Sequence, residues 1–465
     1  GEAPRLDARL GLDEALRALE AAWGCLGLPC ELFEGLGDCL DHFDLDGGGA
    51  LGEAELALAL ERWLEHQAAE AGGRLALAPE VPRRSPSEAG YALGRALGGG
   101  VQGTVRLCTK QGRELCLKGY PRSAGNPFPP RDFLGEVRAM RCSDSRHVAK
   151  VLDVFQDQAF HYMVMEAYTG GDLTTLGRRA ASSGVSLSER WWRGLFKQCL
   201  EGLAHLHSRG FIHCDVKESN VVVASSSSYA APRPVLVDMG LCVPFDDTAG
   251  EGGTIGYMPP EVFTERRWYP NGDTFSLGIV IFQMAIGQVP DATRKVPGVL
   301  YGTTGCPLGR CGELRPGAWA AAHQPLPWDR FPRSWPELCA LAGLMTERDR
   351  ARRPRPAQAL RHAWFASDSD AALPAASLQG LLGAGASGSA EEAPSPAGGP
   401  WKPGAVLPEP RMAPPRGPPK CSDGRPPARP TWPRRLPPPV SVPPGLHATA
   451  CAGGAARAAG APRGA

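Results

Sequence analysis

The spacing of hydrophobic and polar residues divides the chain into regions of different character. Residues 1–70 are rich in Leu, Ala and Glu, and their apolar positions recur at helical intervals. From 88 to 365, alternating runs typical of strands precede longer stretches with helical spacing. Pro, Ala and Gly dominate afterwards, and 21 of the 46 prolines lie in 371–465. We therefore expect a helical region at 1–70, a linker at 71–87, a mixed α+β domain at 88–365 and a disordered tail at 366–465.

The order of elements inside the mixed domain predicts two lobes. Residues 91–120 alternate as strands do, on both sides of a glycine-rich turn, and further strands are predicted at 148–155 and 161–167. A helix with one apolar face is predicted at 131–141, and the pattern is mostly helical from residue 190 onward. This order favours a small sheet-rich lobe joined to a larger helical lobe.

The composition narrows the classes of function. The 50 basic residues balance 49 acidic ones, so the net charge gives no reason to expect a nucleic acid or an acidic membrane as partner. No apolar run reaches the length of a membrane span. The 14 cysteines show no disulfide framework, which favours a reduced, cytoplasmic protein. The chain begins with Gly1 and has no signal peptide, so we expect a fragment or a processed form.

Residues 213–220 read H-C-D-V-K-E-S-N and carry the groups that phosphoryl transfer needs. Asp215 can accept the proton of an attacking hydroxyl, and Lys217 can neutralise the charge of the phosphoryl group during its transfer. Asn220 and Asp238, the latter in a D-M-G triplet, are expected to hold Mg²⁺.

A glycine-rich turn predicts the nucleotide site. Glycines between two strands let backbone N–H groups approach phosphate oxygens. A dinucleotide fold would need a helix directly after the glycines, whereas a strand follows here. We therefore assign this turn to ATP, with the contacts expected from Leu97, Gly98, Gly100, Gly103 and Val105.

Lys118 and Glu136 are predicted to form an ion pair that positions the α- and β-phosphates of ATP. Residues 163–172 are expected to link the two lobes, with backbone groups of Glu166 and Tyr168 facing adenine. Asp172 can reach the ribose or a basic substrate residue, or it can simply cap a helix.

Across about 88–365 the sequence resembles the eukaryotic protein kinases. Further motifs follow in order, among them G-T-I-G-Y-M-P-P-E at 253–261, which ends an activation segment. The resemblance implies a bilobal kinase fold and the cofactors ATP and Mg²⁺. It also implies that Thr254 lies near the catalytic Asp215, that Arg353 pairs with Glu261, and that Asp273 braces the catalytic loop.

Lys217 and Thr254 favour phosphorylation of Ser and Thr on protein substrates, and the linker and the closing H-A-W-F most resemble calcium/calmodulin-related and calcium-dependent kinases. Three positions depart from the family: Cys214, Met239 and Pro259, which stands in place of an Ala. Cys214 stands where an Arg usually binds a phosphate on the activation segment, which argues against control by phosphorylation of Thr248. Cys214 is either a small buried side chain or a redox sensor. Met239 replaces a Phe and should still pack, since Met fills apolar gaps.

Residues 44–55, D-L-D-G-G-G-A-L-G-E-A-E, match a calcium-binding EF-hand loop between helices with apolar faces. The Ca²⁺ ligands are expected from the side chains of Asp44, Asp46 and Glu55 and from the carbonyl of Ala50. Glycines occupy two other ligand positions, so a weak affinity of about 10⁻⁵ M or poorer is expected. Residues 3–14 resemble a degenerate partner loop; the other interpretation of 44–55 is a plain acidic turn.

The leading hypothesis is a calcium-regulated, Mg-ATP-dependent serine/threonine kinase. A calcium-independent, constitutive kinase with a vestigial hand and a pseudokinase scaffold are the two alternatives. In the tail, P-x-x-P strings at Pro427–Pro430 and Pro430–Pro433 either bind an SH3-type domain or form part of a plain solvated segment.

Overall fold

The structure is a computed structural model, and it describes most of the chain up to residue 382. The described residues are 9–26, 33, 35–70, 81–100, 103–122, 131–248, 252–254, 256–288, 326 and 328–382. The P-x-x-P strings of the tail lie outside them. Among the described residues, no helix combines the length and the apolar character needed to cross a bilayer.

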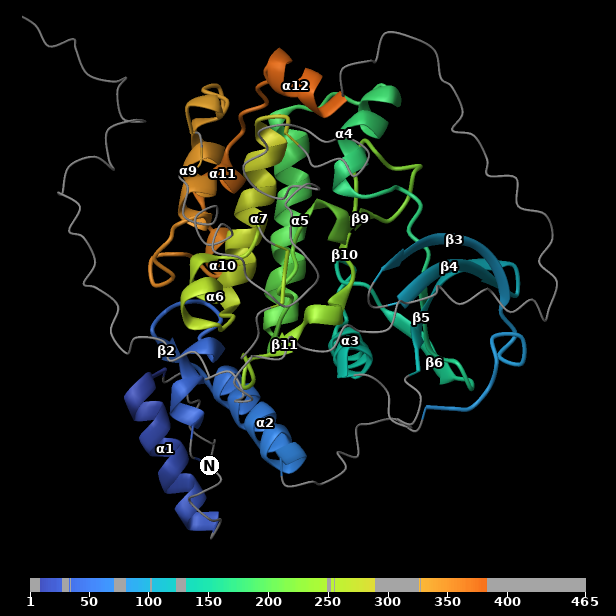
Figure 1. Cartoon of the computed structure of the whole chain (residues 1–465). Helices are drawn as coiled ribbons and strands as arrows, with labels where there is room; N and C mark the ends of the chain where they lie inside the picture. The colour runs from blue at the N-terminus through green and yellow to red at the C-terminus, as the bar shows by residue number, and fades with distance from the viewer. Residues whose placement is uncertain are drawn as a thin grey trace, which may run out of the picture. The chain divides into compact units, whose positions relative to one another are not determined.

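One lobe is built on a five-stranded antiparallel sheet in the order β3-β4-β5-β7-β6 (Figure 1). Its strands are β3 (Ala92–Gly100), β4 (Gly103–Lys110), β5 (Arg113–Pro121), β6 (Val151–Gln156) and β7 (Phe160–Glu166). Helix α3 (Arg131–Cys142) buries Phe133, Val137 and Met140, the apolar face that the sequence predicts. The register Val105↔Lys118 fixes the position of Lys118 inside β5, with three more strand residues after it.

The other lobe is mostly helical. Its helices are α4 (Leu173–Ser182), α5 (Glu189–His207), α6 (Pro260–Glu265), α7 (Pro270–Ala285), α9 (Pro336–Met345), α10 (Pro356–Ala359), α11 (Ala363–Ala366) and α12 (Ala375–Leu382). Short elements connect them: β8 (Phe211–Ile212), η4 (Glu218–Asn220), β9 (Val221–Val223), β10 (Pro234–Leu236), η5 (Met239–Leu241), β11 (Val243–Pro244) and η6 (Trp328–Arg330). Every residue of α7 is buried, which makes this helix the centre of the lobe.

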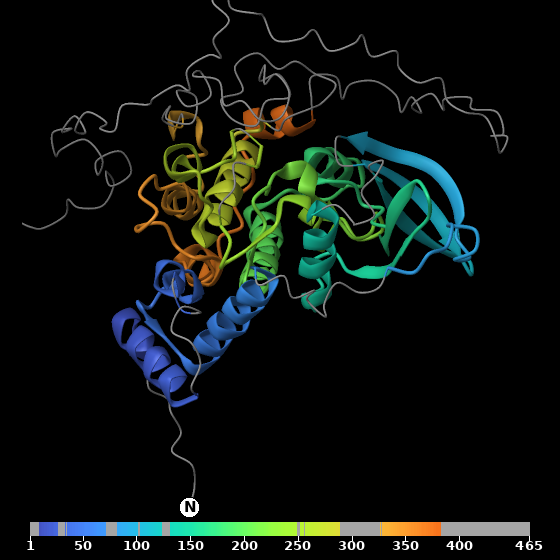
Figure 2. The same ribbon diagram turned by 60° about the horizontal axis from the view of Figure 1, so that its bottom comes forward.

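The N-terminal region, described at residues 9–26, 33 and 35–70, is mostly helical in these parts and packs against the helical lobe (Figures 1 and 2). Its elements are β1 (Leu10–Gly11), α1 (Leu12–Leu26), η2 (Leu36–Asp38), η3 (Leu40–Phe43), β2 (Ala50–Leu51) and α2 (Glu53–Glu70). One apolar core joins side chains of this region to the helical lobe, which contributes Ile212, Cys214, Phe245, Met258, Val262 and Trp268. We call this shared cluster the second core.

Two details of the N-terminal region bear on the expectations from sequence. The helix expected before the acidic loop (residues 44–55) is made of two 3₁₀ turns in its described part, and these turns still bury Leu36, Leu40 and Phe43. The segment 3–14 is described from Arg9 onward, and its role as a partner loop stays a prediction. Leu10 pairs with Leu51 in a short antiparallel ladder, so the two segments face each other.

The boundary of the tail expected at residue 366 is wrong, because the packed chain continues to Leu382. The backbone carbonyl of Ala371 accepts hydrogen bonds from Glu189 and Trp335. Helix α12 then lies so close to the turn after α7 that a Cβ on Gly287 would meet the carbonyl oxygen of Ser377 at 2.2 Å. The composition change along the sequence precedes the structural boundary because small residues such as Ala and Gly also suit close helix packing.

Candidate active site

Lys118 lies at the meeting point of β5, α3 and the segment after β10. Its ammonium donates to both oxygens of Glu136, at 3.2 and 2.9 Å, and to Asp238 at 2.6 Å. Burial opposes the charged form of Lys118, but the two carboxylates outweigh it and raise the lysine pKa. Burial raises the pKa of Glu136 to about 7, against the influence of Lys118. The hydroxyl of Tyr120 also donates to Glu136, so the carboxylate of Glu136 accepts hydrogen bonds from two side chains.

Three of the predicted side chains bind the carboxylate of Asp215, two from the catalytic loop and one from the activation segment. One oxygen of Asp215 accepts from the hydroxyl of Thr254 at 2.6 Å. The other accepts from Lys217 at 2.7 Å and from the amide of Asn220 at 3.0 Å. Lys217 also donates to Thr254 at 2.8 Å. The carboxylate is therefore fixed in orientation and next to a cation, in the arrangement that phosphoryl transfer to a hydroxyl requires.

A buried carboxylate on α7 fixes the backbone of the catalytic loop. Asp273 is fully buried in α7 and accepts from the backbone N–H groups of His213 and Cys214, at 2.8 and 2.9 Å. His207 on α5 lies 2.8 Å from the same carboxylate. These bonds keep Cys214 at a φ of 66°, a left-handed conformation that costs a non-glycine residue about 1–3 kcal/mol. The brace expected from Asp273 is present, and His207 is an addition that the motifs did not indicate.

The departures from the family pattern have structural explanations. Met239 is fully buried, as expected, in the apolar core that also contains Phe133 of α3 and Phe196 of α5, which we call the main core. Cys214 is 2% exposed and lies in the second core, where burial raises its pKa well above the ordinary value. That environment favours the interpretation as a small packed side chain over the redox sensor, because the thiolate is the reactive form. Thr248 is also buried, which agrees with the doubt about its phosphorylation.

The glycine-rich turn lies in the β3–β4 hairpin, where Gly98 pairs with Val105 and Gly100 with Gly103. Gly103 has a φ of 146°, and a Cβ there would meet the carbonyl oxygen of Gly119 at 2.2 Å. Glycine is thus required at 103 by the neighbouring strand as well as by any phosphate. Leu97, on the same strand, is 46% exposed.

The linker between the lobes begins at the end of β7. Glu166 forms an ion pair with Arg113 at 2.9 Å, while Tyr168 is half-buried against the main core. Asp172 caps helix α4 and accepts from the backbone N–H of Thr175. The capping role is thus observed, and the contact of Asp172 with a ribose or a substrate stays a prediction.

Arg353 and Glu261 form the ion pair expected from the motifs. The two guanidinium nitrogens of Arg353 bind the two oxygens of Glu261 at 2.5 and 3.1 Å. Arg353 is 3% exposed and also donates to the backbone carbonyl of Glu347 at 2.9 Å. This pair fixes the end of the activation segment to the base of the helical lobe.

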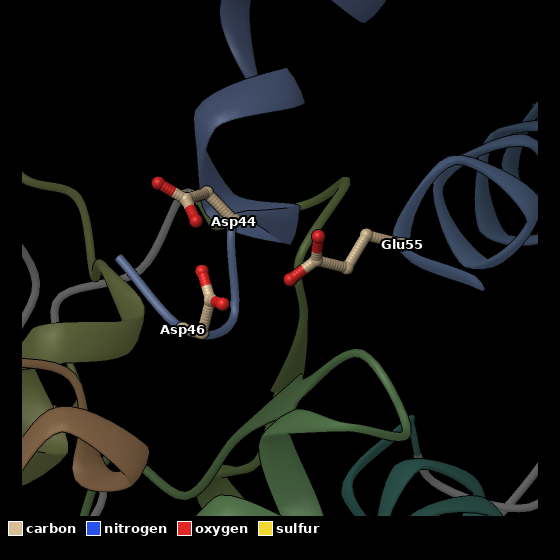
Figure 3. A group of neighbouring side chains, drawn as sticks. All are labelled: Asp44, Asp46 and Glu55. Carbon is tan, nitrogen blue, oxygen red and sulfur yellow. The ribbon is translucent and has the colours of Figure 1, made fainter. Parts of the chain in front are cut away.

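The acidic loop brings three predicted ligands together (Figure 3). Asp44 and Asp46 extend from the loop and Glu55 reaches in from the first turn of α2, with one carboxylate oxygen of each within 4.8 Å of the others. Ala50 lies in β2, facing Gly11 across the ladder. Backbone N–H groups already orient the carboxylates: Gly49 donates to Asp44, and Leu45 and Gly52 donate to Glu55.

A side chain that the sequence pattern did not indicate lies at this loop. Arg9 donates to both oxygens of Asp46, at 2.9 and 2.6 Å, and lies 3.7 Å from Glu55. The hydrogen bond from Arg9 lowers the pKa of Asp46. No local signal reveals such a contact, since the two residues are 37 positions apart and meet through the β1–β2 ladder.

Comparisons with known proteins agree with this geometry. The protein kinase domain family matches residues 91–365. The chain is 30% identical over 209 residues to calcium/calmodulin-dependent protein kinase type II of Caenorhabditis elegans, covering 43% of this chain and 28% of the relative. It is 32% identical over 211 residues to CBL-interacting protein kinase 4 of Oryza sativa, covering 43% of this chain and 45% of the relative.

A third relative covers more of the chain. Calcium/calmodulin-dependent protein kinase type II subunit delta of Oryctolagus cuniculus is 28% identical over 287 residues, which is 59% of this chain and 49% of the relative. The chain thus spans less than half the length of these three relatives. The match of the family over more than half of the chain, together with the cluster around Asp215, leads to one conclusion: the chain belongs to the protein kinase family and contains a serine/threonine protein kinase domain.

Proposed function

We propose that this protein transfers the γ-phosphate of ATP to Ser and Thr hydroxyls of protein substrates, and that Ca²⁺ binding at the acidic loop regulates the transfer. The observation that carries the first part is the arrangement of Lys217, Thr254 and Asn220 around the Asp215 carboxylate. The observation that carries the second is the convergence of three carboxylates in a loop that packs on the kinase domain.

In this mechanism Asp215 would orient the substrate hydroxyl and take its proton as the new P–O bond forms, while the bond from the γ-phosphorus to the bridging oxygen breaks and ADP leaves. Lys217, 2.7 Å from Asp215, counters the negative charge that develops on the phosphoryl group. Lys118 binds the α- and β-phosphates and is itself held by Glu136. The substrate hydroxyl would displace the hydroxyl of Thr254 from its place on Asp215.

Asn220 and Asp238 offer an amide and a carboxylate oxygen, the oxygen donors that Mg²⁺ prefers. Asp238 is held in the left-handed region at a φ of 62° and bound by Lys118, so its carboxylate is fixed near the phosphate-binding lysine. Bound Mg-ATP supplies the phosphoryl group and the cation that screens its charge. Glycines 98, 100 and 103, with Leu97, Val105, Glu166, Tyr168 and Asp172, are the further nucleotide contacts that we propose.

In this proposal the N-terminal region acts as an EF-hand with a degenerate partner. Asp44, Asp46, Glu55 and the carbonyl of Ala50 are the proposed Ca²⁺ ligands, all of them oxygen donors. The regulatory part of the proposal is supported by one contact just before the loop and one in its first half. His42 Nδ1 lies 2.8 Å from the carbonyl oxygen of Phe245 in the activation segment. Gln358 on α10 donates to the carbonyl of Gly47 at 3.0 Å.

The Glu55→Gln variant tests regulation by calcium. Removal of one charge from the bidentate ligand should weaken calcium binding at least tenfold and abolish the difference in kcat between calcium and a chelator. The assay measures transfer of labelled phosphate to a Ser/Thr peptide library by the full chain, beside calorimetric titration with Ca²⁺. Equal kcat for the unsubstituted protein with calcium and with chelator would contradict the proposal and leave the constitutive kinase as the answer.

Arg9 should compete with Ca²⁺ for the acidic loop, because its guanidinium binds Asp46 and lies near Glu55. The Arg9→Gln variant is expected to bind Ca²⁺ about two- to fivefold more tightly, the range of an exposed ion pair. Arg17→Gln is the matched control, since Arg17 is exposed on α1 and its loss changes the net charge equally. Calorimetric titration compares the three proteins; equal affinities in both variants would mean that Arg9 does not compete.

A further inference from the structure

We propose that helix α2 of the N-terminal region positions helix α3 of the kinase domain, and that Glu65 and Arg138 are the positioning residues. The guanidinium of Arg138 on α3 binds the carboxylate of Glu65 on α2. Arg62, one turn earlier on α2, donates to the same carboxylate at 2.7 Å. The carboxylate of Glu65 therefore lies between two cations, one from each helix.

Two further elements of the kinase domain meet at this junction. The guanidinium groups of Arg62 and Arg138 lie over the ring of Phe211, at 5.2 and 5.6 Å from its centre. Phe211 belongs to β8, the strand that leads into the catalytic loop. His66 on α2 lies 3.3 Å from the carboxylate of Asp246, in the activation segment. Helix α2 thus contacts α3, β8 and the activation segment at one place.

The junction is partly buried, which strengthens these electrostatic contacts. The side chains of Arg62 and Asp246 are 6% and 5% exposed, and that of Glu65 is 17% exposed. Ion pairs and cation–ring contacts that are partly removed from water are screened less than surface pairs. Loss of Glu65 or Arg138 would leave a partly buried charge with fewer partners. We expect α3 to shift its position as a result.

Helix α3 connects the junction to the reacting groups. Arg138 lies two residues after Glu136, and on a helix residues two positions apart face away from each other. Glu136 points to Lys118, while Arg138 points to α2. A displacement of α3 would draw Glu136 away from Lys118, and placement errors of about 1 Å can cost about 10²-fold in rate. The junction thus sets the geometry of the Lys118–Glu136 pair from the outer side of the helix.

This inference rests on the proposed phosphoryl transfer and does not need the proposed response to calcium. Both meet in α2, however, since Glu55 lies in the first turn of the helix and Glu65 ten residues further on. A calcium-dependent change at Glu55 would reach α3 along one rigid element. Helix α2 therefore connects the acidic loop to α3, even though the loop precedes the kinase domain in the sequence.

The test is a double-mutant cycle in the full chain, with Glu65→Ala, Arg138→Ala and the two together. Each single variant should lower kcat about tenfold, within the range of known coupling energies, with the peptide KM unchanged within about twofold. The double variant should be no slower than the singles, since the pair acts as a unit. Arg138→Lys should recover most of kcat. Glu61→Ala and Arg141→Ala are the matched controls, because both residues are exposed on the same two helices.

Each outcome decides between a positioning role and a merely structural one. Unchanged kcat in the single variants, multiplied losses in the double variant, or no recovery in Arg138→Lys would overturn the inference. A lower melting temperature with unchanged kcat per folded molecule would do the same. Absence of Ser/Thr phosphorylation by the unsubstituted protein would instead contradict the proposed function. The ratio of kcat with and without calcium, measured in the same variants, reports the calcium route separately.

Discussion

Replacement of Asp215 by Asn should lower kcat about 10²- to 10⁴-fold, the contribution of a positioned general base. The carboxylate accepts from Thr254, Lys217 and Asn220, so its orientation is fixed before any substrate arrives. An amide at this position cannot take the proton of the substrate hydroxyl, and its NH₂ group would face other donors. The KM for ATP should change little, because Lys118 and not Asp215 is expected to hold the phosphates.

The measurement is the initial rate of phosphate transfer to a Ser/Thr peptide at saturating ATP. Asp144→Asn makes the same chemical change at a carboxylate whose side chain is 85% exposed, and it should leave kcat unchanged. Asp215→Ala, which adds no amide donor, checks that the loss reflects the missing carboxylate. Equal rates for Asp215→Asn and the unsubstituted protein would identify the chain as a pseudokinase scaffold.

Replacement of Arg353 by Ala should destabilise the helical lobe by about 3–5 kcal/mol, the cost of an unpaired charge in a buried ion pair. Glu261 would lose both of its guanidinium contacts while it stays 4% exposed. The carbonyl of Glu347 would also lose a donor. A loss of this size corresponds to a drop in melting temperature of roughly 10 °C for a domain of this length.

Thermal unfolding followed by circular dichroism measures this effect, with Lys150→Ala as the control. Lys150 pairs with Asp144 at 2.6 Å, but both side chains are exposed, so that loss should stay within about 1 kcal/mol. A double variant, Glu261→Leu with Arg353→Met, should recover most of the stability, because it removes both buried charges. Equal destabilisation by Arg353→Ala and Lys150→Ala would show that burial does not increase the cost of breaking the ion pair.

The local parts of the site could be predicted from the sequence because each motif contains its own chemistry. The spacing of Asp215, Lys217 and Asn220 within six residues already limits where their side chains can meet. The pair Lys118–Glu136 followed from a strand and a helix with a clear apolar face. The 12-residue spacing of the acidic loop likewise predicted the approach of Asp44, Asp46 and Glu55.

What escaped prediction depends on contacts between distant segments. An amphipathic helix shows that it buries a face, but not which surface covers that face, so the docking of α2 on α3 and β8 could not be foreseen. Glu65 and Arg138 are 73 residues apart and look like ordinary surface charges in the sequence. The extent of the domain beyond residue 366 was missed for a related reason, since the Ala- and Gly-containing stretch that forms α12 gives a weak signal by composition.

The second core has a consequence for how this protein can be dissected. Ile212, Cys214, Phe245, Met258, Val262 and Trp268 are covered by side chains of the N-terminal region, so the match of the kinase family at residue 91 does not mark the edge of an independent folding unit. A truncation at that boundary would cut through a hydrophobic interior and uncover an apolar face directly beneath the catalytic loop. The acidic loop and the kinase domain are therefore parts of one architecture rather than separable modules, and the small side chain of Cys214 lies where the two are joined.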